Sequence, residues 1–181
     1  MYNNFNYVST VVDSLSHFVQ FFPCQKGITG EDVLKLIMDR WIGPFGKPNA
    51  LHSDNDVRFK QQKGFFQSAF RALDIETHFA RPRHPVSNGL CENVNRQFLQ
   101  NLRAFSLSCK TNNWPTLVSY CTWLMNSQIS PSTGFSPHEM FLGRPSWPFD
   151  LVPEPTTNPD VHAWLMQQLL IQEKASLRLQ N

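Results

Sequence analysis

Hydrophobic and polar positions along this chain predict several short strands. Residues 7–14 (YVSTVVDS) and 17–25 (HFVQFFPCQ) are runs of β-branched and aromatic side chains separated by a short turn that contains serine. This pattern is typical of a β-hairpin. Two shorter strand patterns follow at 49–53 (NALHS) and 75–80 (IETHFA), the second with alternating polar and apolar positions. The chain is therefore expected to contain a sheet.

Helical spacing of apolar residues separates and follows these strands. Thr29 precedes two acidic residues and a helical repeat of apolar residues, so it is the expected N-cap of a helix that Gly43-Pro44 should end. Further helices are predicted at 64–73, 90–108, 114–126, 136–142 and from Pro159 onward. Strands that alternate with helices predict a mixed α/β sheet with crossover helices. We expect residues 1–150 to form this domain and residues 151–181 to form a linker and a C-terminal helix.

Composition narrows the class of protein. The chain has 181 residues, of which 41% are hydrophobic and 17% charged, as in an ordinary globular domain. No apolar run approaches the roughly 20 residues that a membrane span requires, and the N-terminal residues lack the pattern of a signal peptide. The four cysteines are far apart, which indicates reduced thiols. These features predict a nuclear or cytoplasmic protein that is not secreted and has no membrane partner.

The distribution of charge is more informative than the net charge of +2. Between Thr77 and Asn112 lie five basic residues and a single acidic one, Glu92. Within the predicted helix 90–108, Glu92 and Arg96 fall on the outward face, opposite an apolar seam. A phosphate-bearing partner would explain a basic strip around one carboxylate, although chance clustering stays open on charge alone.

Two acidic residues are the best candidates for chemistry. Asp54 directly follows a predicted strand, and Glu92 begins a helix after a loop that contains glycine. Such positions carry reactive groups in α/β folds, and two carboxylates that meet there would bind a divalent cation through oxygen. The alternative is structural: Asp54 caps a turn, and Glu92 is stabilised by the helix dipole.

Three segments in this order change that balance: HSDNDVRF (52–59), HPVSNGLCENVNR (84–96) and NSQISPSTGFSPHEMFLGRP (126–145). Together with VVDSLSHFVQFFPCQK (11–26), they resemble the integrase catalytic core of retroviruses and gypsy-type LTR retrotransposons. The resemblance covers about four-fifths of the chain. It implies a ribonuclease-H-like mixed sheet flanked by helices.

The resemblance also assigns residues. Asp54 and Glu92 match the second and third acidic residues of the family's catalytic triad, and they are the expected ligands of Mg²⁺ or Mn²⁺. Residues of the loop and helix that end at Arg96 match positions that contact DNA in the family; a packing role for His84 is equally open. The matched DNA-binding residues are His84, Ser87, Asn88, Gly89, Asn95 and Arg96.

The family's first catalytic aspartate has no counterpart. Asp13 matches a non-catalytic position of the second strand, and residues 1–6 contain no acidic residue. We therefore expect the first, central strand of the sheet to be missing, which leaves an exposed edge and weakens metal binding.

These assignments imply DNA integration by polynucleotidyl transfer, with an incomplete triad that makes this isolated chain inactive. The alternative is a non-enzymatic nucleic-acid-binding or assembly module derived from an integrase. A ribonuclease-H-type nuclease shares the fold but not the second and third segments. DNA is the expected partner, and self-association is left open.

Overall fold

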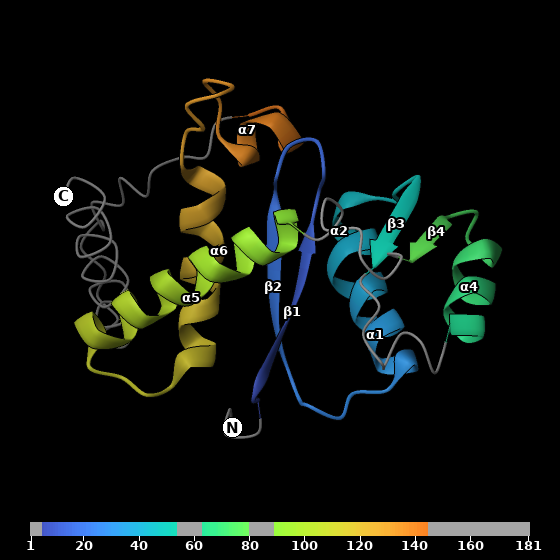
Figure 1. The fold of residues 1–181 in the computed structure, drawn as a ribbon, viewed down its shortest axis with the longest axis horizontal. Coiled ribbons are helices and arrows are strands. Elements are labelled where there is room, and N and C mark those ends of the chain that lie inside the picture. The colour runs from blue at the N-terminus through green and yellow to red at the C-terminus, as the bar shows by residue number, and fades with distance from the viewer. Residues whose placement is uncertain (1–4, 54–62, 80–88, 145–181) are drawn as a thin grey trace, which may run out of the picture. The chain divides into compact units, whose positions relative to one another are not determined.

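The computed structural model describes residues 5–53, 63–79 and 89–144 (Figure 1). The chain divides into two compact units. Among the described residues, the first comprises 9–23 and 95–144, and the second comprises 5–8, 24–53, 63–79 and 89–94. The predicted linker and helix at 151–181 lie outside the described residues.

The first unit is built from a hairpin and helices. Its elements are β1 (Tyr7–Val12), β2 (Val19–Cys24), α5 (Gly89–Cys109), η3 (Trp114–Leu117), α6 (Val118–Ser127) and α7 (Pro137–Leu142). Some end residues of β1, β2 and α5 belong to the second unit. The Asp13 N–H donates to the Phe18 carbonyl at 2.8 Å, so the two strands run antiparallel. The predicted hairpin is confirmed, as are the helices that end near residues 109, 127 and 142.

Aromatic side chains join the hairpin to the helices of this unit. The Phe21 ring of β2 stacks on Phe98 of α5, with ring centroids 4.2 Å apart. The Phe18 ring, directly before β2, stacks on Phe141 of α7 at 4.5 Å. Phe18, Phe21 and Phe98 are almost fully buried. Because burial of one such side chain contributes about 1.5–3 kcal/mol, these stacks are major stabilising contacts of the unit.

The second unit contains the other helices and a pair of strands. Its elements are α1 (Gly30–Ile37), η1 (Met38–Ile42), α2 (Gly43–Phe45), β3 (Ala50–Ser53), α4 (Lys63–Ala72) and β4 (Glu76–Phe79). β3 and β4 are parallel, with Ala50 opposite Glu76 and Ser53 opposite Phe79. The predicted strands at 49–53 and 75–80 are confirmed over these residues.

One predicted helix end is wrong. Thr29 caps α1 as expected, in a reciprocal capping box with Asp32. The helical path does not stop at Gly43-Pro44, however, but continues through a π-helical segment, η1, into α2. It ends at Gly46, whose φ of 89° lies in a region that other residues rarely adopt. Pro44 lies where the path changes from the π-helical segment to α2, directly before this end.

The described strands form two sheets, with the orders β1-β2 and β3-β4. The first is antiparallel and the second parallel, the two kinds of pairing that a mixed α/β sheet contains. Within the described ranges no hydrogen-bonded strand joins the two sheets.

Candidate functional site

The predicted catalytic residues follow β3 along the chain in one case and lie in α5 in the other. β3 ends at Ser53, so Asp54 is the next residue, but it lies outside the described part of the chain. Glu92 lies in the first turn of α5 with an exposed side chain. The positive end of the helix dipole favours a carboxylate at this position. That Asp54 and Glu92 meet stays a prediction.

The amphipathic character of α5 is confirmed. Val94, Phe98 and Phe105 are buried on one side of the helix. The opposite side is exposed and carries Glu92, Arg96, Leu99, Arg103 and Leu107 at spacings of three and four residues. Glu92 therefore lies at the start of this outward face, and the other two charged residues on the face are arginines.

The predicted DNA-binding residues fall into two groups. His84, Ser87 and Asn88 lie outside the described residues. Gly89, Asn95 and Arg96 lie on α5 and are exposed. Asn95 has a defined partner: the Thr10 hydroxyl of β1 donates to its side-chain oxygen at 2.7 Å. Sequence patterns gave no indication of Thr10, which lies 85 residues away from its partner.

Asp13 has a structural role. Its carboxylate accepts hydrogen bonds from the Ser16 N–H and the Ser16 hydroxyl, both at 2.7 Å, and from the Leu15 N–H at 3.2 Å. These bonds close the turn between β1 and β2, which His17 completes with a positive φ of 60°. This arrangement explains Asp13 without chemistry, in agreement with its exclusion from the predicted triad.

The third motif of the sequence also has a structural explanation. Ser136 caps α7 in a capping box with Glu139, Pro137 occupies the first turn, and Gly143 ends the helix with a φ of 68°. The Glu139 carboxylate accepts hydrogen bonds from the Ser136 N–H and hydroxyl, both at 2.8 Å, and these bonds lower the pKa of Glu139. The S-P-x-E-x-x-x-G pattern is thus a complete set of helix start and stop signals.

Asn126 is an important residue whose role the sequence did not reveal. It is buried near the end of α6, where its side-chain oxygen accepts a hydrogen bond from the Val19 N–H and its amide nitrogen donates to the Val19 carbonyl, both at 2.8 Å. The amide therefore satisfies both backbone groups of a β2 residue, as a neighbouring strand would.

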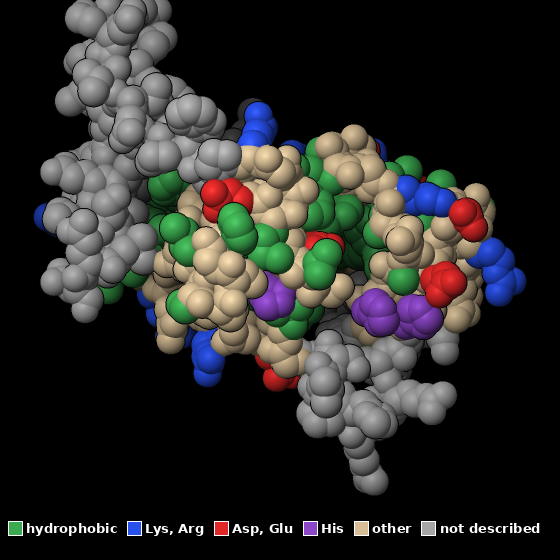
Figure 2. Space-filling model, turned by 90° about the horizontal axis from the view of Figure 1, so that it is seen from above, with side chains coloured by type: hydrophobic (Ala, Val, Ile, Leu, Met, Phe, Trp, Pro, Cys, Tyr) green, Lys and Arg blue, Asp and Glu red, His purple; other side chains and the backbone are tan. Residues whose placement is uncertain are grey.

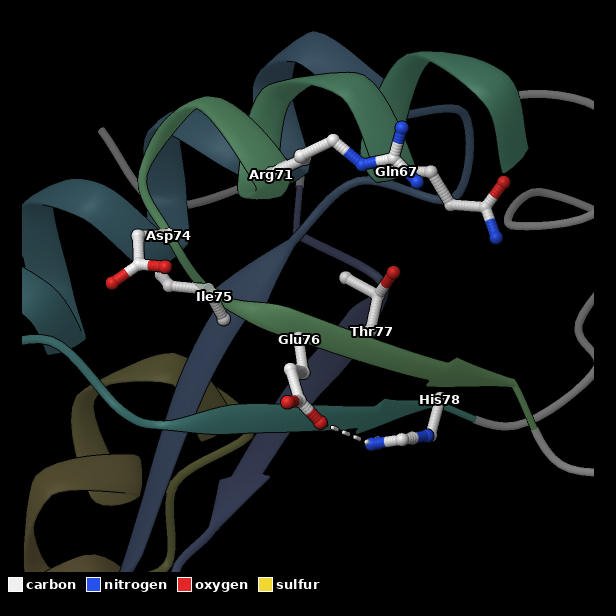
Figure 3. Close-up of a pocket in the computed structure, with 7 residues that line it drawn as sticks. All are labelled: Gln67, Arg71, Asp74, Ile75, Glu76, Thr77 and His78. Atoms are coloured by element: carbon white, nitrogen blue, oxygen red, sulfur yellow. Dashed lines mark ion pairs between the residues drawn. The ribbon is translucent and has the colours of Figure 1, made fainter.

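A concavity lies elsewhere in the second unit, between α4 and β4 (Figure 3). It has a volume of about 350 Å³ and includes none of the predicted site residues. Figure 3 shows Thr77 pointing toward α4, and Glu76 and His78 pointing to the other side of the strand. The Nε2 atom of His78 lies 3.3 Å from the Glu76 carboxylate, and the His78 ring stacks on His52 of β3.

On the face in Figure 2, acidic and basic side chains of the described residues are interspersed, and neither kind forms a patch there. Within the described ranges, no three histidine, cysteine or acidic side chains are grouped so that they would bind a metal ion. The same part of the chain has no helix that is both long and apolar enough to cross a membrane. None of the four cysteines, all of which lie in described residues, forms a disulfide.

Comparison with known proteins gives consistent relatives. The chain is 28% identical over 141 residues to the Pro-Pol polyprotein of simian foamy virus type 1 and, over the same length, to the Pol polyprotein of radiation murine leukemia virus. The aligned region is 78% of this chain but only 12% and 24% of those polyproteins. The chain therefore spans a quarter or less of the curated relatives it matches. No family model matches it.

Solved structures agree on the fold. A chain of the simian T-cell lymphotropic virus intasome, solved in complex with the PP2A regulatory subunit B56 gamma, matches with a TM-score of 0.63, 20% identity and coverage of 84% of this chain and 56% of that chain. The HTLV-2 integrase catalytic core in complex with magnesium matches with TM-scores of 0.59 for a trimeric form and 0.60 for a dimeric form, again at 20% identity. These matches cover 75% and 78% of this chain and 92% and 88% of the HTLV-2 chains. The predicted fold class, that of the ribonuclease-H-like integrase core, is confirmed.

Proposed function

We propose that this chain, which has the fold of retroviral integrase cores and a sequence similar to retroviral Pol polyproteins, acts in DNA integration by polynucleotidyl transfer. The observation that carries the proposal is the position of Glu92 within that fold. This residue begins the exposed face of α5, and Arg96 follows it by one helical turn. A carboxylate beside a guanidinium is suited to a phosphodiester substrate, because the first binds a cation and the second an anion.

Asp54 and Glu92 are the proposed ligands of a magnesium or manganese ion. Both supply carboxylate oxygens, which hard divalent cations prefer, and the Glu92 side chain is exposed and open to such an ion. A bound cation would stabilise the charge that develops on the phosphate oxygens during transfer. The HTLV-2 core, which shares the fold, is described in complex with magnesium.

The outward face of α5 is the proposed DNA contact. Arg96 and Arg103 lie on this face two turns apart, and Asn95 borders it. Contacts of this kind with the phosphate backbone fix the position of DNA and do not read its sequence. Binding should therefore weaken steeply as the salt concentration rises. Such a partner implies that the chain acts in the nucleus or cytoplasm.

The test is a strand-transfer assay with labelled DNA ends, the chain and Mg²⁺ or Mn²⁺, together with a binding assay on the same DNA. We expect salt-sensitive binding that Arg96→Gln weakens. Any joining should be lost in Asp54→Asn and Glu92→Gln but kept in Asp13→Asn, the matched control, because Asp13 only closes a turn.

Three outcomes separate the alternatives. Joining that Asp13→Asn abolishes would show that the acidic residues have been misassigned. Joining by this chain would favour the enzyme, whereas salt-sensitive binding without joining is expected both of a core with an incomplete triad and of the non-enzymatic nucleic-acid-binding module. If the folded chain bound no DNA at low salt, the proposed function would be wrong. Sedimentation of the same samples, with and without DNA, would determine whether the chain self-associates.

A further inference from the structure

The hydrogen bond between Thr10 and Asn95 links two elements of the first unit. Thr10 lies in the middle of β1, and Asn95 lies on α5, three residues after Glu92. The hydroxyl of Thr10 donates to the Asn95 side-chain oxygen at 2.7 Å, a length typical of a good hydrogen bond between a hydroxyl and a carbonyl. The contact therefore fixes the Asn95 side chain against the strand.

The position of Asn95 on the helix gives this contact a consequence for the exposed surface. Val94 and Phe98 face the core, whereas Arg96 faces outward. At 100° per residue, Asn95 falls between these two sides. Asn95 is exposed and is bonded to the hydroxyl of β1, at the border of the outward face.

The chemistry of the amide determines which group it presents. An asparagine side chain has an oxygen that only accepts hydrogen bonds and a nitrogen that only donates them. When the oxygen accepts from Thr10, the NH₂ group is the part that is turned away from the strand. A phosphate oxygen only accepts hydrogen bonds, so this orientation matches it. The reverse orientation would turn the carbonyl oxygen toward an anion.

We propose that Thr10 is a positioning residue that holds the Asn95 amide with its NH₂ group outward, so that Asn95 donates to a phosphate oxygen of DNA beside Arg96. This inference rests on the proposed function and adds to it a residue outside the three motifs. Thr10 itself does not touch the DNA. It acts through Asn95 alone, and that restriction makes the proposal testable.

The experiment measures the affinity of the folded full chain for a fluorescently labelled DNA duplex by anisotropy at several salt concentrations. Thr10→Val has the same shape without the hydroxyl, and Thr10→Ser keeps the hydroxyl. We expect Thr10→Val to weaken DNA binding about two- to tenfold, as the loss of one hydrogen bond would. Thr10→Ser should bind DNA like the parent chain. Ser9→Ala, the loss of a neighbouring hydroxyl on β1, is the matched control and should bind like the parent chain.

Two further readouts distinguish a positioning role from general damage. First, Thr10→Val should have no additional effect in an Asn95→Ala background, because its only route to the DNA is then gone. Second, Thr10→Val should leave the salt dependence unchanged, since a neutral amide releases no counterions. Arg96→Gln should instead reduce the slope of log K against log salt concentration by about one.

The outcomes are distinct. If Thr10→Val bound DNA as tightly as the parent chain, or weakened binding equally in the Asn95→Ala background, the positioning role would be wrong while the proposed function stood. If the parent chain bound no DNA, both would fall together. Thermal unfolding of each variant, followed by circular dichroism, verifies that affinity is compared between folded proteins.

Discussion

The hydrogen bonds of Asn126 provide the sharpest test of how the first unit is stabilised. The side chain is 4% exposed and its partner Val19 is 1% exposed, so water cannot replace either bond. Replacing Asn126 with leucine keeps most of the volume but leaves the N–H and the carbonyl of Val19 without partners. Each unsatisfied buried group costs about 1–3 kcal/mol, so we expect the free energy of unfolding to fall by roughly 2–5 kcal/mol.

A loss of this size is large beside the roughly 5–15 kcal/mol that stabilises a typical domain. It should be measured by urea unfolding, with tryptophan fluorescence and circular dichroism followed in parallel. Asn126→Ala should cost somewhat more than Asn126→Leu, because it also leaves a small cavity. Gln128→Ala, an exposed position just beyond the same helix, is the control and should change stability by less than about 0.5 kcal/mol.

Asn126→Asp adds a signature that depends on pH. The carboxyl group can still accept from the Val19 N–H, but it can donate to the carbonyl only when it is protonated. Burial also disfavours the charged form, so we expect the pKa of this carboxyl to be raised in the folded state. A raised pKa means that the variant is most stable at low pH and loses stability as the pH rises through that pKa. The reasoning would be refuted if Asn126→Leu unfolded within about 1 kcal/mol of the parent chain, or if the cost of Asn126→Asp did not depend on pH.

Three further predictions concern single side chains. Ser136→Ala removes the N-cap of α7 and should destabilise the chain by about 1 kcal/mol in the same urea assay, whereas Ser136→Thr should preserve the cap. Hydrogen bonds from Ser136 lower the pKa of Glu139 in the folded chain. The ionised carboxylate therefore stabilises the fold at pH values above the ordinary pKa of a glutamate, and this stabilisation is lost as the pH falls through the lowered pKa. The stability difference between the parent chain and Glu139→Gln should therefore shrink in urea titrations repeated from neutral pH to below pH ~4; an unchanged difference would contradict this role. Burial raises the pKa of the Cys121 thiol to about 12, so a thiol reagent at pH ~8 should label exposed Cys91 readily and Cys121 only on unfolding. Mass spectrometry of the peptides measures the labelling of each cysteine. Labelling of Cys121 in the folded chain as fast as that of Cys91 would contradict the burial of Cys121.

Local signals in the sequence were sufficient for most of the secondary structure. Thr29 and Ser136 each precede an acidic residue by three positions, and both form the capping boxes that this spacing favours. The buried and exposed sides of α5 likewise follow from the period of its apolar residues. The signal of Gly43-Pro44 was misleading, since the helical path continues through η1 and α2 to Phe45.

The remaining features depend on contacts between distant residues. Asn126 stood within a recognised motif, but nothing near it in the sequence indicates that its amide bonds to a strand 107 residues away. The partnership of Thr10 and Asn95 is hidden for the same reason, because both are ordinary polar residues in regular elements. Asp54 and Glu92 were selected by their positions after a strand and at the start of a helix, and the resemblance then assigned their roles.

The long reach of Asn126 has a consequence for biosynthesis. Asn126 is synthesised 107 residues after Val19. A ribosome adds roughly 5–20 residues per second, so the N–H and carbonyl of Val19 lack this partner for on the order of 5–20 s. During that interval the nascent hairpin has an unpaired strand edge and solvent-exposed phenylalanine side chains, both of which promote aggregation. Slower elongation should prolong this exposure, so the yield of soluble chain should depend on the speed of translation and on chaperones that bind emerging hydrophobic segments.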